Sequence, residues 1–276
     1  SSRRTEVERF TANTIHRESE TQTRPLTEGF TASDSQVGHN MDLVKVFESY
    51  RGKDRIIRLS TYVLMFLGGR GNTPWQTKCR KISAELGGCR VVLRLFDDFS
   101  MLMLNLSKGF GLKESNPFLR PLEVVSAVLG QLYYPVEHIA WLRDKEVLPG
   151  NSGLLWLSGL FIWAVTLVNE IAKCVIKLRV NSMKTYHLQK QKHLEKSEDR
   201  ELNTEQSQQI EDNLRKLALE RQDLLLAIVQ SSADFINAVS WLPKGFLWSQ
   251  KISPSVNGIF GFVASVIMLF RNWPTK

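Results

Sequence analysis

The sequence has little cysteine and none of the short motifs that usually mark catalytic or metal sites. Its 276 residues include three cysteines, none in a CxxC pair, so neither a disulfide framework nor a zinc site is predicted. A GxSxG elbow, an HExxH pair and a P-loop are also missing. We therefore expect no catalytic residue, no cofactor and no bound metal.

Positive charge exceeds negative charge. Lys and Arg together number 36 against 28 Asp and Glu, which gives a formal net charge of +8. Such a balance favours an anionic partner such as lipid headgroups or nucleic acid. No nucleic-acid-binding module is recognisable, and two long apolar segments argue against one. We expect lipid and no nucleic acid.

Those two segments carry no charge. Residues 147–169 form a run of 23 and residues 252–270 a run of 19, each able to cross about 30 Å of hydrocarbon as a helix. The alternative for each is a buried helix of a soluble protein, and Pro254 shortens the second. The fold class that follows is all-α: a helical membrane protein with amphipathic N-terminal helices, an apolar hairpin or span region and a C-terminal apolar helix.

Composition shifts divide the chain. Residues 1–40 are rich in charged and hydroxyl residues, which predicts a disordered extension. We expect the remainder to comprise amphipathic membrane-remodelling helices (41–145), a first membrane helix with a basic flank (146–180), a polar linker (181–209), a packing or oligomerisation helix with an elbow (210–250) and a C-terminal membrane helix (251–276).

The first amphipathic helix is expected over residues 42–67. Apolar residues recur on one face at helical spacing, and basic residues recur on another. An interfacial helix places such basic side chains among lipid headgroups. The candidate membrane-binding residues here are Lys45, Arg51, Arg55 and Arg58.

A second helix is expected over residues 77–107, with a thin polar stripe on an otherwise apolar surface. The stripe comprises Arg90, Arg94, Asp97, Asp98 and Asn105. Because Arg94 lies three residues before Asp97 and four before Asp98, we expect local ion pairs within the stripe. Such a helix fits a membrane interface or the inside of a helical bundle, and both remain open. The candidate membrane-binding residues are Arg90, Arg94, Phe96, Phe99 and Leu102; Gly87 and Gly88 are candidates for a kink.

A third helix starts at Pro121 and is interrupted by Pro135. Its uncharged run, residues 124–136, is too short for a span and favours a buried or interfacial segment. Tyr133, Tyr134 and Trp141 suit an interfacial aromatic belt or packing against the second helix.

The region after the first apolar segment is basic over residues 173–196, which suits anionic headgroups or an exposed face. From Ile210 a three-four pattern predicts a helix that packs on another helix, in this chain or in a partner. The residues expected to mediate oligomerisation are Leu217, Leu224, Ile228 and Phe235. Trp241 and Trp248 flank a Pro and a Gly, which indicates an interfacial elbow or a helix stop followed by core aromatics.

Four segments carry a family resemblance. ESYRGKDR (48–55), LRLFDDF (93–99), QLYYPVEHIAWL (131–142) and NAVSWLPKGFLW (237–248) resemble, in this order, the peroxin-eleven family of peroxisomal membrane proteins, most like its gamma form. The likeness covers residues 41–273, and residues 1–40 have no counterpart in it.

The resemblance implies a non-enzymatic protein of the peroxisomal membrane that elongates and tubulates the membrane before fission. It also implies homo-oligomers, hetero-oligomers with other family members, and contact with a fission adaptor and a dynamin-like GTPase. Wedging of the two amphipathic helices into one leaflet is a compatible mechanism. The alternatives are a pore for small metabolites lined by the polar stripe, and a passive scaffold that recruits fission proteins.

Topology has two opposing indications. The positive-inside rule places the basic stretch 173–196 in the cytosol. The family pattern of two spans with both termini cytosolic places it in the lumen. One span plus a re-entrant or surface C-terminal helix also fits the sequence.

Overall fold

The computed structural model describes residues 42–197 and 204–274, and helix is the only regular secondary structure within them. The all-α class is therefore confirmed. The chain separates into two units, residues 1–43 and 44–276, and the fold described below is that of the second. The predicted disordered extension, residues 1–40, lies outside the described residues.

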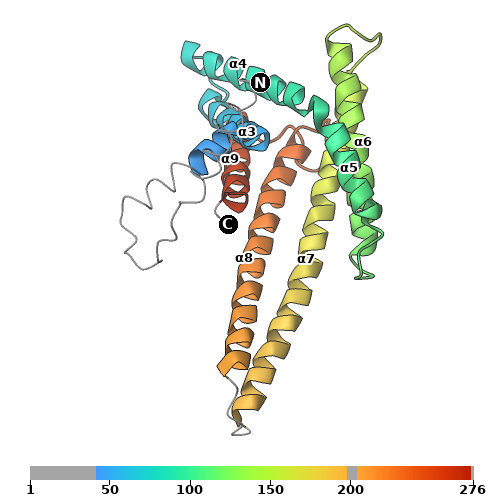
Figure 1. The fold of residues 1–276 in the computed structure, drawn as a ribbon. Coiled ribbons are helices and arrows are strands. Elements are labelled where there is room, and N and C mark those ends of the chain that lie inside the picture. The colour runs from blue at the N-terminus through green and yellow to red at the C-terminus, as the bar shows by residue number, and fades with distance from the viewer. Residues whose placement is uncertain (1–41, 198–203, 275–276) are drawn as a thin grey trace, which may run out of the picture. The chain divides into compact units, whose positions relative to one another are not determined.

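The helices of this unit follow one another through short connections (Figure 1). They are α3 (Tyr50–Gly68), α4 (Pro74–Leu93), α5 (Asp97–Ser107), α6 (Arg120–Asp144), α7 (Gly153–Ser197), α8 (Thr204–Ser240) and α9 (Pro254–Arg271), with 3-10 turns η1 (Arg94–Phe96) and η2 (Gly109–Gly111). Helices α7 and α8 pack as a hairpin, α6 packs on α7, and α9 packs on both α8 and α3, which in turn packs on α4.

Side-chain caps fix several helix starts. The Ser49 hydroxyl accepts from the backbone N–H of Gly52 and begins α3, so the helix predicted over 42–67 is broken at this residue. Thr73 and Gln76 form a capping box at α4. Ser253 caps α9, whose first residue is Pro254. That proline opens the C-terminal apolar helix, because its missing N–H is not needed there.

The helix predicted over 77–107 is two helices joined by η1. The change of geometry falls at Arg94–Phe96 and not at the glycine pair, since Gly87 and Gly88 both lie inside α4. Intrinsic helix propensity alone therefore placed the kink wrongly.

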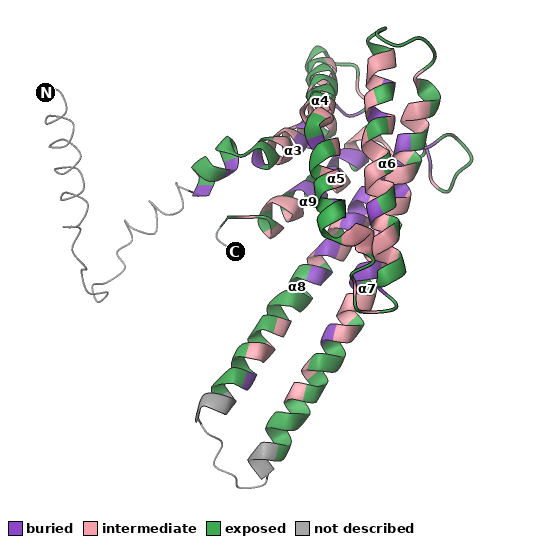
Figure 2. Cartoon of the chain, turned by 45° about the vertical axis from the view of Figure 1, so that its right-hand side comes forward, coloured by how far each residue is buried: buried purple, intermediate pink, exposed green. Residues whose placement is uncertain are grey.

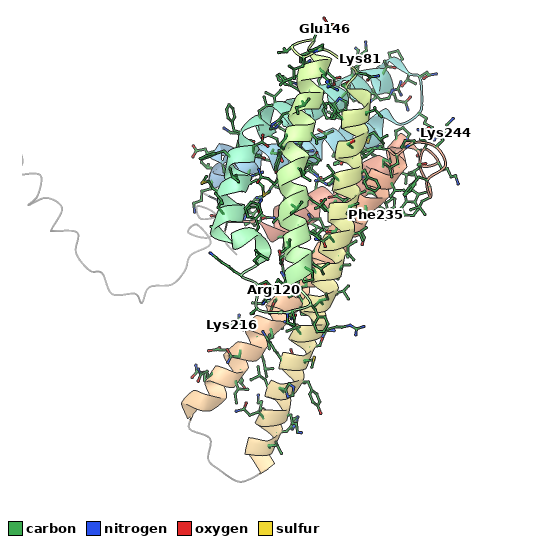
Figure 3. The ribbon with its side chains drawn as sticks, turned by 90° about the vertical axis from the view of Figure 1, so that its right-hand side faces the viewer. Lys81, Arg120, Glu146, Lys216, Phe235 and Lys244 are labelled. Atoms are coloured by element: carbon green, nitrogen blue, oxygen red, sulfur yellow. The ribbon has the colours of Figure 1, made fainter. Side chains whose placement is uncertain are left out.

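Pro135 does not interrupt its helix. Helix α6 runs through it from Arg120 to Asp144, so the predicted interruption is wrong. A proline removes one backbone hydrogen bond, while α6 packs along α7 over its length (Figure 3), with Arg120 and Glu146 near its two ends. This tertiary packing outweighs the local cost.

The α7–α8 hairpin has two small apolar clusters, one around Ala164, Leu167 and Ala238 and another around Cys174, Leu224 and Ala227. Beyond them the hairpin is largely exposed (Figure 2). The side-chain amide of Asn181 donates to the carbonyl of Leu217 at 3.0 Å, across the two helices. Most of the predicted linker 181–209 is therefore helix, with only residues 198–203 outside the described ones.

Two helices are long and apolar enough to cross a membrane, by length and composition. One lies in Gly153–Leu194 and the other is Pro254–Arg271. Only 22% and 28% of their most apolar windows are buried, which argues against the core of a soluble protein, because core helices are mostly covered.

Candidate functional site

The polar stripe of α4 and α5 points into the bundle, and the apolar side points out. Asp97 and Asn105 are 3% and 5% exposed, whereas Phe96 and Phe99 are 83% and 68% exposed. This is the reverse of an ordinary soluble amphipathic helix. The outward face extends along both helices through Ile82, Val92, Met103, Leu104 and Leu106.

Each charged residue of the stripe pairs with a side chain on another helix. The pairs are Arg90 with Asp54 (2.8 Å), Arg94 with Glu137 (2.5 Å), Asp97 with Arg51 (3.0 Å) and Asp98 with His138 (2.9 Å). The predicted local pairs within the stripe are therefore wrong. Partners on α3 and α6 reach these side chains because the stripe faces those helices.

Glu137 is the centre of the α6 side of this network. Besides Arg94, it accepts from the Tyr133 hydroxyl at 2.9 Å. Burial and the Glu137 carboxylate raise the pKa of Tyr133. Burial acts to lower the pKa of Arg94, but Tyr133 and Glu137 hold it above the ordinary value. Tyr133 stays a neutral donor and Arg94 a cation.

Arg58 lies inside the bundle, although the sequence pattern places it among headgroups. It is 7% exposed. Its guanidinium pairs with Asp234 on α8, donates from Nε to the Ser265 hydroxyl on α9 at 3.1 Å and lies over the Tyr62 ring. Burial raises the pKa of Asp234, against the lowering effect of Arg58. Sequence reasoning missed Asp234 and Ser265, yet an acid within the apolar three-four pattern of α8 was a usable signal.

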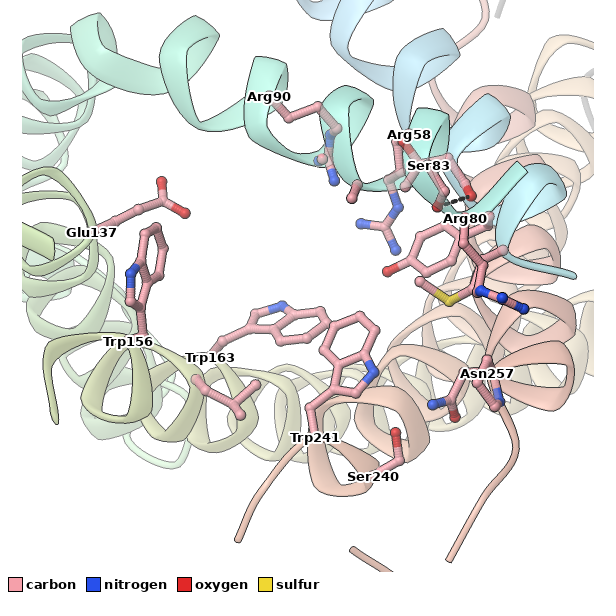
Figure 4. Close-up of a pocket in the computed structure, with 18 of the residues that line it drawn as sticks. Arg58, Arg80, Ser83, Arg90, Glu137, Trp156, Trp163, Ser240, Trp241 and Asn257 are labelled. Atoms are coloured by element: carbon pink, nitrogen blue, oxygen red, sulfur yellow. Dashed lines mark hydrogen bonds between the residues drawn. The ribbon is translucent and has the colours of Figure 1, made fainter. Parts of the chain in front are cut away.

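A cavity of about 720 Å³ lies between these helices (Figure 4). Its polar wall includes Arg58 of α3 and Arg90 of α4, together with Arg94 and Glu137. The rest of the cavity lining comes from α7, from the α8–α9 elbow (residues 241–253) and from the start of α9. The other wall holds Trp156, Trp163 and Trp241. The cavity therefore brings an aromatic surface to face a wall of arginines.

The remaining candidate membrane-binding residues occupy different settings. Lys45 is exposed, Arg55 and Leu102 are half-buried, and Arg51 keeps 51% of its side chain exposed while it pairs with Asp97. Contact of any of them with lipid stays a prediction.

The candidate interfacial aromatics make contacts inside the chain. Trp163 and Trp241 stack at 6.0 Å between ring centroids and 25° between planes. Trp248 meets Phe235 edge-on at 6.0 Å and donates from Nε1 to the carbonyl of Ile236. Tyr134 packs edge-on against Tyr133, and Trp141 is half-buried. An interfacial role for these five residues remains a prediction.

The candidate oligomerisation residues face α7 of their own chain. Leu224 is buried with Cys174, Ile228 packs beside it, Phe235 packs on the Ala164 cluster and the Leu217 carbonyl accepts from Asn181. Within the described part of the chain, no group of His, Cys, Asp or Glu side chains could hold a metal ion.

Internal ion pairs, an outward apolar face and two membrane-length helices define an all-helical membrane protein. The chain matches the family Peroxisomal biogenesis factor 11 (PEX11) over residues 41–273. It belongs to this family and is a peroxisomal membrane protein, so the resemblance and its extent are confirmed.

Relatives agree with this assignment. Peroxisomal membrane protein 11C, the gamma form, is 30% identical in Homo sapiens over 83% of this chain and 92% of the relative. The Mus musculus protein of the same name is 32% identical over 82% and 90%. Peroxisomal membrane protein 11E of Arabidopsis thaliana is 25% identical over 85% and 92%. No solved structure matches the chain.

Proposed function

We propose that this protein elongates and curves the peroxisomal membrane by inserting the outward apolar face of α4 and α5 into one leaflet, and so promotes fission and proliferation of the organelle. The carrying observation is the exposure of Phe96 and Phe99 opposite the buried Asp97 and Asn105. Acting in this way requires no catalytic residue.

The orientation of the stripe supports a wedge that stays folded. Because Arg90 and Arg94 are paired within the bundle, insertion of the apolar face does not transfer an unpaired charge into lipid. A helix pair seated in one leaflet expands it relative to the other, which favours curvature. Helices α7 and α9 then serve as anchors.

Oligomers would concentrate many small wedges. Since Leu217, Leu224, Ile228 and Phe235 contact α7 of the same chain, a second copy or another family member would meet a different face. The outward side of α8 offers Leu219, Leu225 and Val229, which are 60%, 48% and 49% exposed. Contacts with a fission adaptor and a dynamin-like GTPase are part of the same proposal, and membership of the family supports them.

The test is electron microscopy of anionic liposomes that contain the full-length chain. Wild-type protein is expected to draw out tubules, and Phe96→Glu with Phe99→Glu is expected to abolish them. Undiminished tubulation by this double variant would contradict insertion of the apolar face as the mechanism. If liposomes that contain wild-type protein stay spherical while the protein still binds fission proteins normally, the protein acts as a passive scaffold.

Two controls separate the wedge from general damage. Phe96→Leu with Phe99→Leu keeps the face apolar and should tubulate normally. Met183→Glu with Tyr186→Glu places the same charges on the exposed part of α7, away from the wedge and from the proposed oligomer face, and should leave tubulation intact. Circular dichroism of every variant checks the helical content.

A pore for small metabolites is a second candidate, favoured by two internal cavities that share Arg58 and Trp163. The larger has about 720 Å³ and the smaller, between α7, α8 and α9, about 410 Å³. Conductance in planar bilayers that rises in Trp163→Ala and falls in Arg90→Gln would support the pore. Tubulation with no conductance would favour the wedge.

A further inference from the structure

The larger cavity has two chemically different walls. In Figure 4, Arg58 from α3 and Arg90 from α4 point into it from one side, and Trp163 and Trp241 lie on the other. The two indoles are stacked and come from α7 and from the α8–α9 elbow. Such a site presents donors to one end of a ligand and a flat apolar surface to the rest.

The arginines of the cavity are not fully neutralised. Three of them pair with carboxylates: Arg58 with Asp234, Arg90 with Asp54 and Arg94 with Glu137. Arg80 has no carboxylate partner among the described residues and instead donates to the carbonyls of Gly68 and Gly71. That end of α3 supplies only the partial charge of a helix terminus. Arg80 is half-buried, so one positive charge of the cavity lining remains without a carboxylate, and a single negative charge would balance it.

Hydrogen-bonding capacity also remains unused. Arg90 and Arg94 donate from Nε and Nη2 to their carboxylate partners, and Arg58 donates from Nη2 to Asp234 and from Nε to the Ser265 hydroxyl. No hydrogen bond from Nη1 of these three arginines occurs within residues 42–197 and 204–274. Asn257 lines the cavity, is 5% exposed, and its Oδ1 has no partner in the same residues. Buried polar atoms usually have partners, so these atoms point to a ligand that supplies acceptors and a donor, directly or through water.

The proposed membrane span of α7 gives the cavity access from the lipid. Trp156, Leu160 and Trp163 belong to the first half of α7, inside the segment long and apolar enough to span a bilayer. On this proposed span, the part of the aromatic wall that α7 supplies lies at the depth of hydrocarbon. The volume of about 720 Å³ falls in the range of small-molecule sites, which are mostly apolar with a few placed polar groups.

We propose that this cavity binds a single-chain amphiphile that carries one negative charge. Its anionic head lies between Arg58 and Arg90, and its chain lies along Trp163 and Trp241. A fatty-acid carboxylate and the phosphodiester of a lysophospholipid share this chemistry. The inference goes beyond membrane curvature, because a wedge needs no internal ligand.

The test uses the full chain in nanodiscs of phosphatidylcholine and a nitroxide-labelled stearic acid that quenches tryptophan fluorescence. We expect saturable quenching above a linear background from probe dissolved in the bilayer, and only the background from the methyl ester of the same probe. Displacement by unlabelled stearate but not by lysophosphatidylglycerol would identify a carboxylate site. Displacement by both would identify a site for either head.

Variants locate the site. Trp163→Phe with Trp241→Phe should remove the saturable component. Arg80→Gln should weaken probe affinity by about tenfold, or about 1.4 kcal/mol, whereas Arg80→Lys keeps the charge and should change it less than about twofold. Equal, linear quenching by the acid and its ester would overturn the proposal, as would undiminished affinity in Arg80→Gln.

Discussion

Arg94 and Glu137 join η1 to α6 through two parallel hydrogen bonds, Nε to Oε2 at 3.0 Å and Nη2 to Oε1 at 2.5 Å. Their side chains are 18% and 4% exposed. A bidentate arginine–carboxylate pair fixes orientation as well as distance. It therefore fixes the orientation of the bend between α4 and α5 relative to α6. The direction in which the apolar face points is fixed by the same pair.

Replacing one partner of this pair should destabilise the fold. Glu137→Ala leaves the Arg94 guanidinium inside the bundle without a carboxylate, and we expect the free energy of unfolding to fall by about 3–5 kcal/mol. Chemical unfolding in detergent, followed by circular dichroism, measures it.

The matched comparison uses an exposed pair. Lys192 and Glu211 are 2.8 Å apart with side chains 46% and 63% exposed, so Glu211→Ala should change stability little. Arg94→Met with Glu137→Leu, which removes both charges, should recover most of the loss. Equal effects of Glu137→Ala and Glu211→Ala would contradict a structural role for the buried pair.

Two glycine substitutions should have opposite signs. A Cβ on Gly261 of α9 would overlap the Tyr62 ring of α3, whereas one on Gly88 of α4 would meet nothing within 4 Å. Gly261→Ala should cost about 1–3 kcal/mol by overpacking, and Gly88→Ala should add up to about 1 kcal/mol through helix propensity. Thermal unfolding of both variants checks the order, and a stabilising Gly261→Ala would refute the close approach of α3 and α9.

Acid should weaken the contact between α6 and α7. Glu123 lies 3.3 Å from Lys173 and 3.4 Å from Lys177. Burial acts to raise the pKa of Glu123, but the two lysines hold it below the ordinary value of 4.5. A lowered folded-state pKa contributes stability above about pH 4.5, and this contribution is lost as pH falls through the folded-state value.

The measurement is the difference in unfolding midpoint between wild type and Glu123→Gln across this pH range. We expect the difference to shrink on acidification, because protonation removes from the wild type the charge that the variant already lacks. A constant difference would show that the two lysines do not act on this carboxylate.

Sequence periodicity predicted which residues of α4 and α5 share a face, but not what that face meets. The partners of the stripe lie far away in the chain: Arg94 and Glu137 are 43 residues apart, and Arg58 and Ser265 are 207 apart. A helical pattern carries no information about such separations. It therefore left both the membrane interface and the bundle interior open. The structure places the polar side in the bundle interior and leaves the apolar side exposed.

The spans were more predictable than the linker. Uncharged length is a local property, so the C-terminal apolar run, 252–270, falls within two residues of the observed helix Pro254–Arg271, and the first run, 147–169, overlaps the beginning of α7. The helical extension of α7 to Ser197 depends instead on packing against α8, as at Asn181 and Leu217. Residues that look like a polar linker become helix when a neighbouring helix supplies partners for their side chains.

Cys89 gives a direct measurement of the outward face. It is exposed, while Cys79 and Cys174 are buried, and it lies seven residues from both Ile82 and Phe96 on the apolar side of α4. A thiol-reactive nitroxide should therefore label Cys89 alone.

If this face enters lipid, electron paramagnetic resonance of the labelled protein in liposomes should show more frequent collision of the label with oxygen than with a polar nickel complex, because oxygen concentrates in hydrocarbon. A label at Lys192→Cys in a Cys89→Ser background should show the reverse order, because its surroundings on the hairpin are charged. Preference of the Cys89 label for the nickel complex would place α4 in water and remove the basis for the wedge.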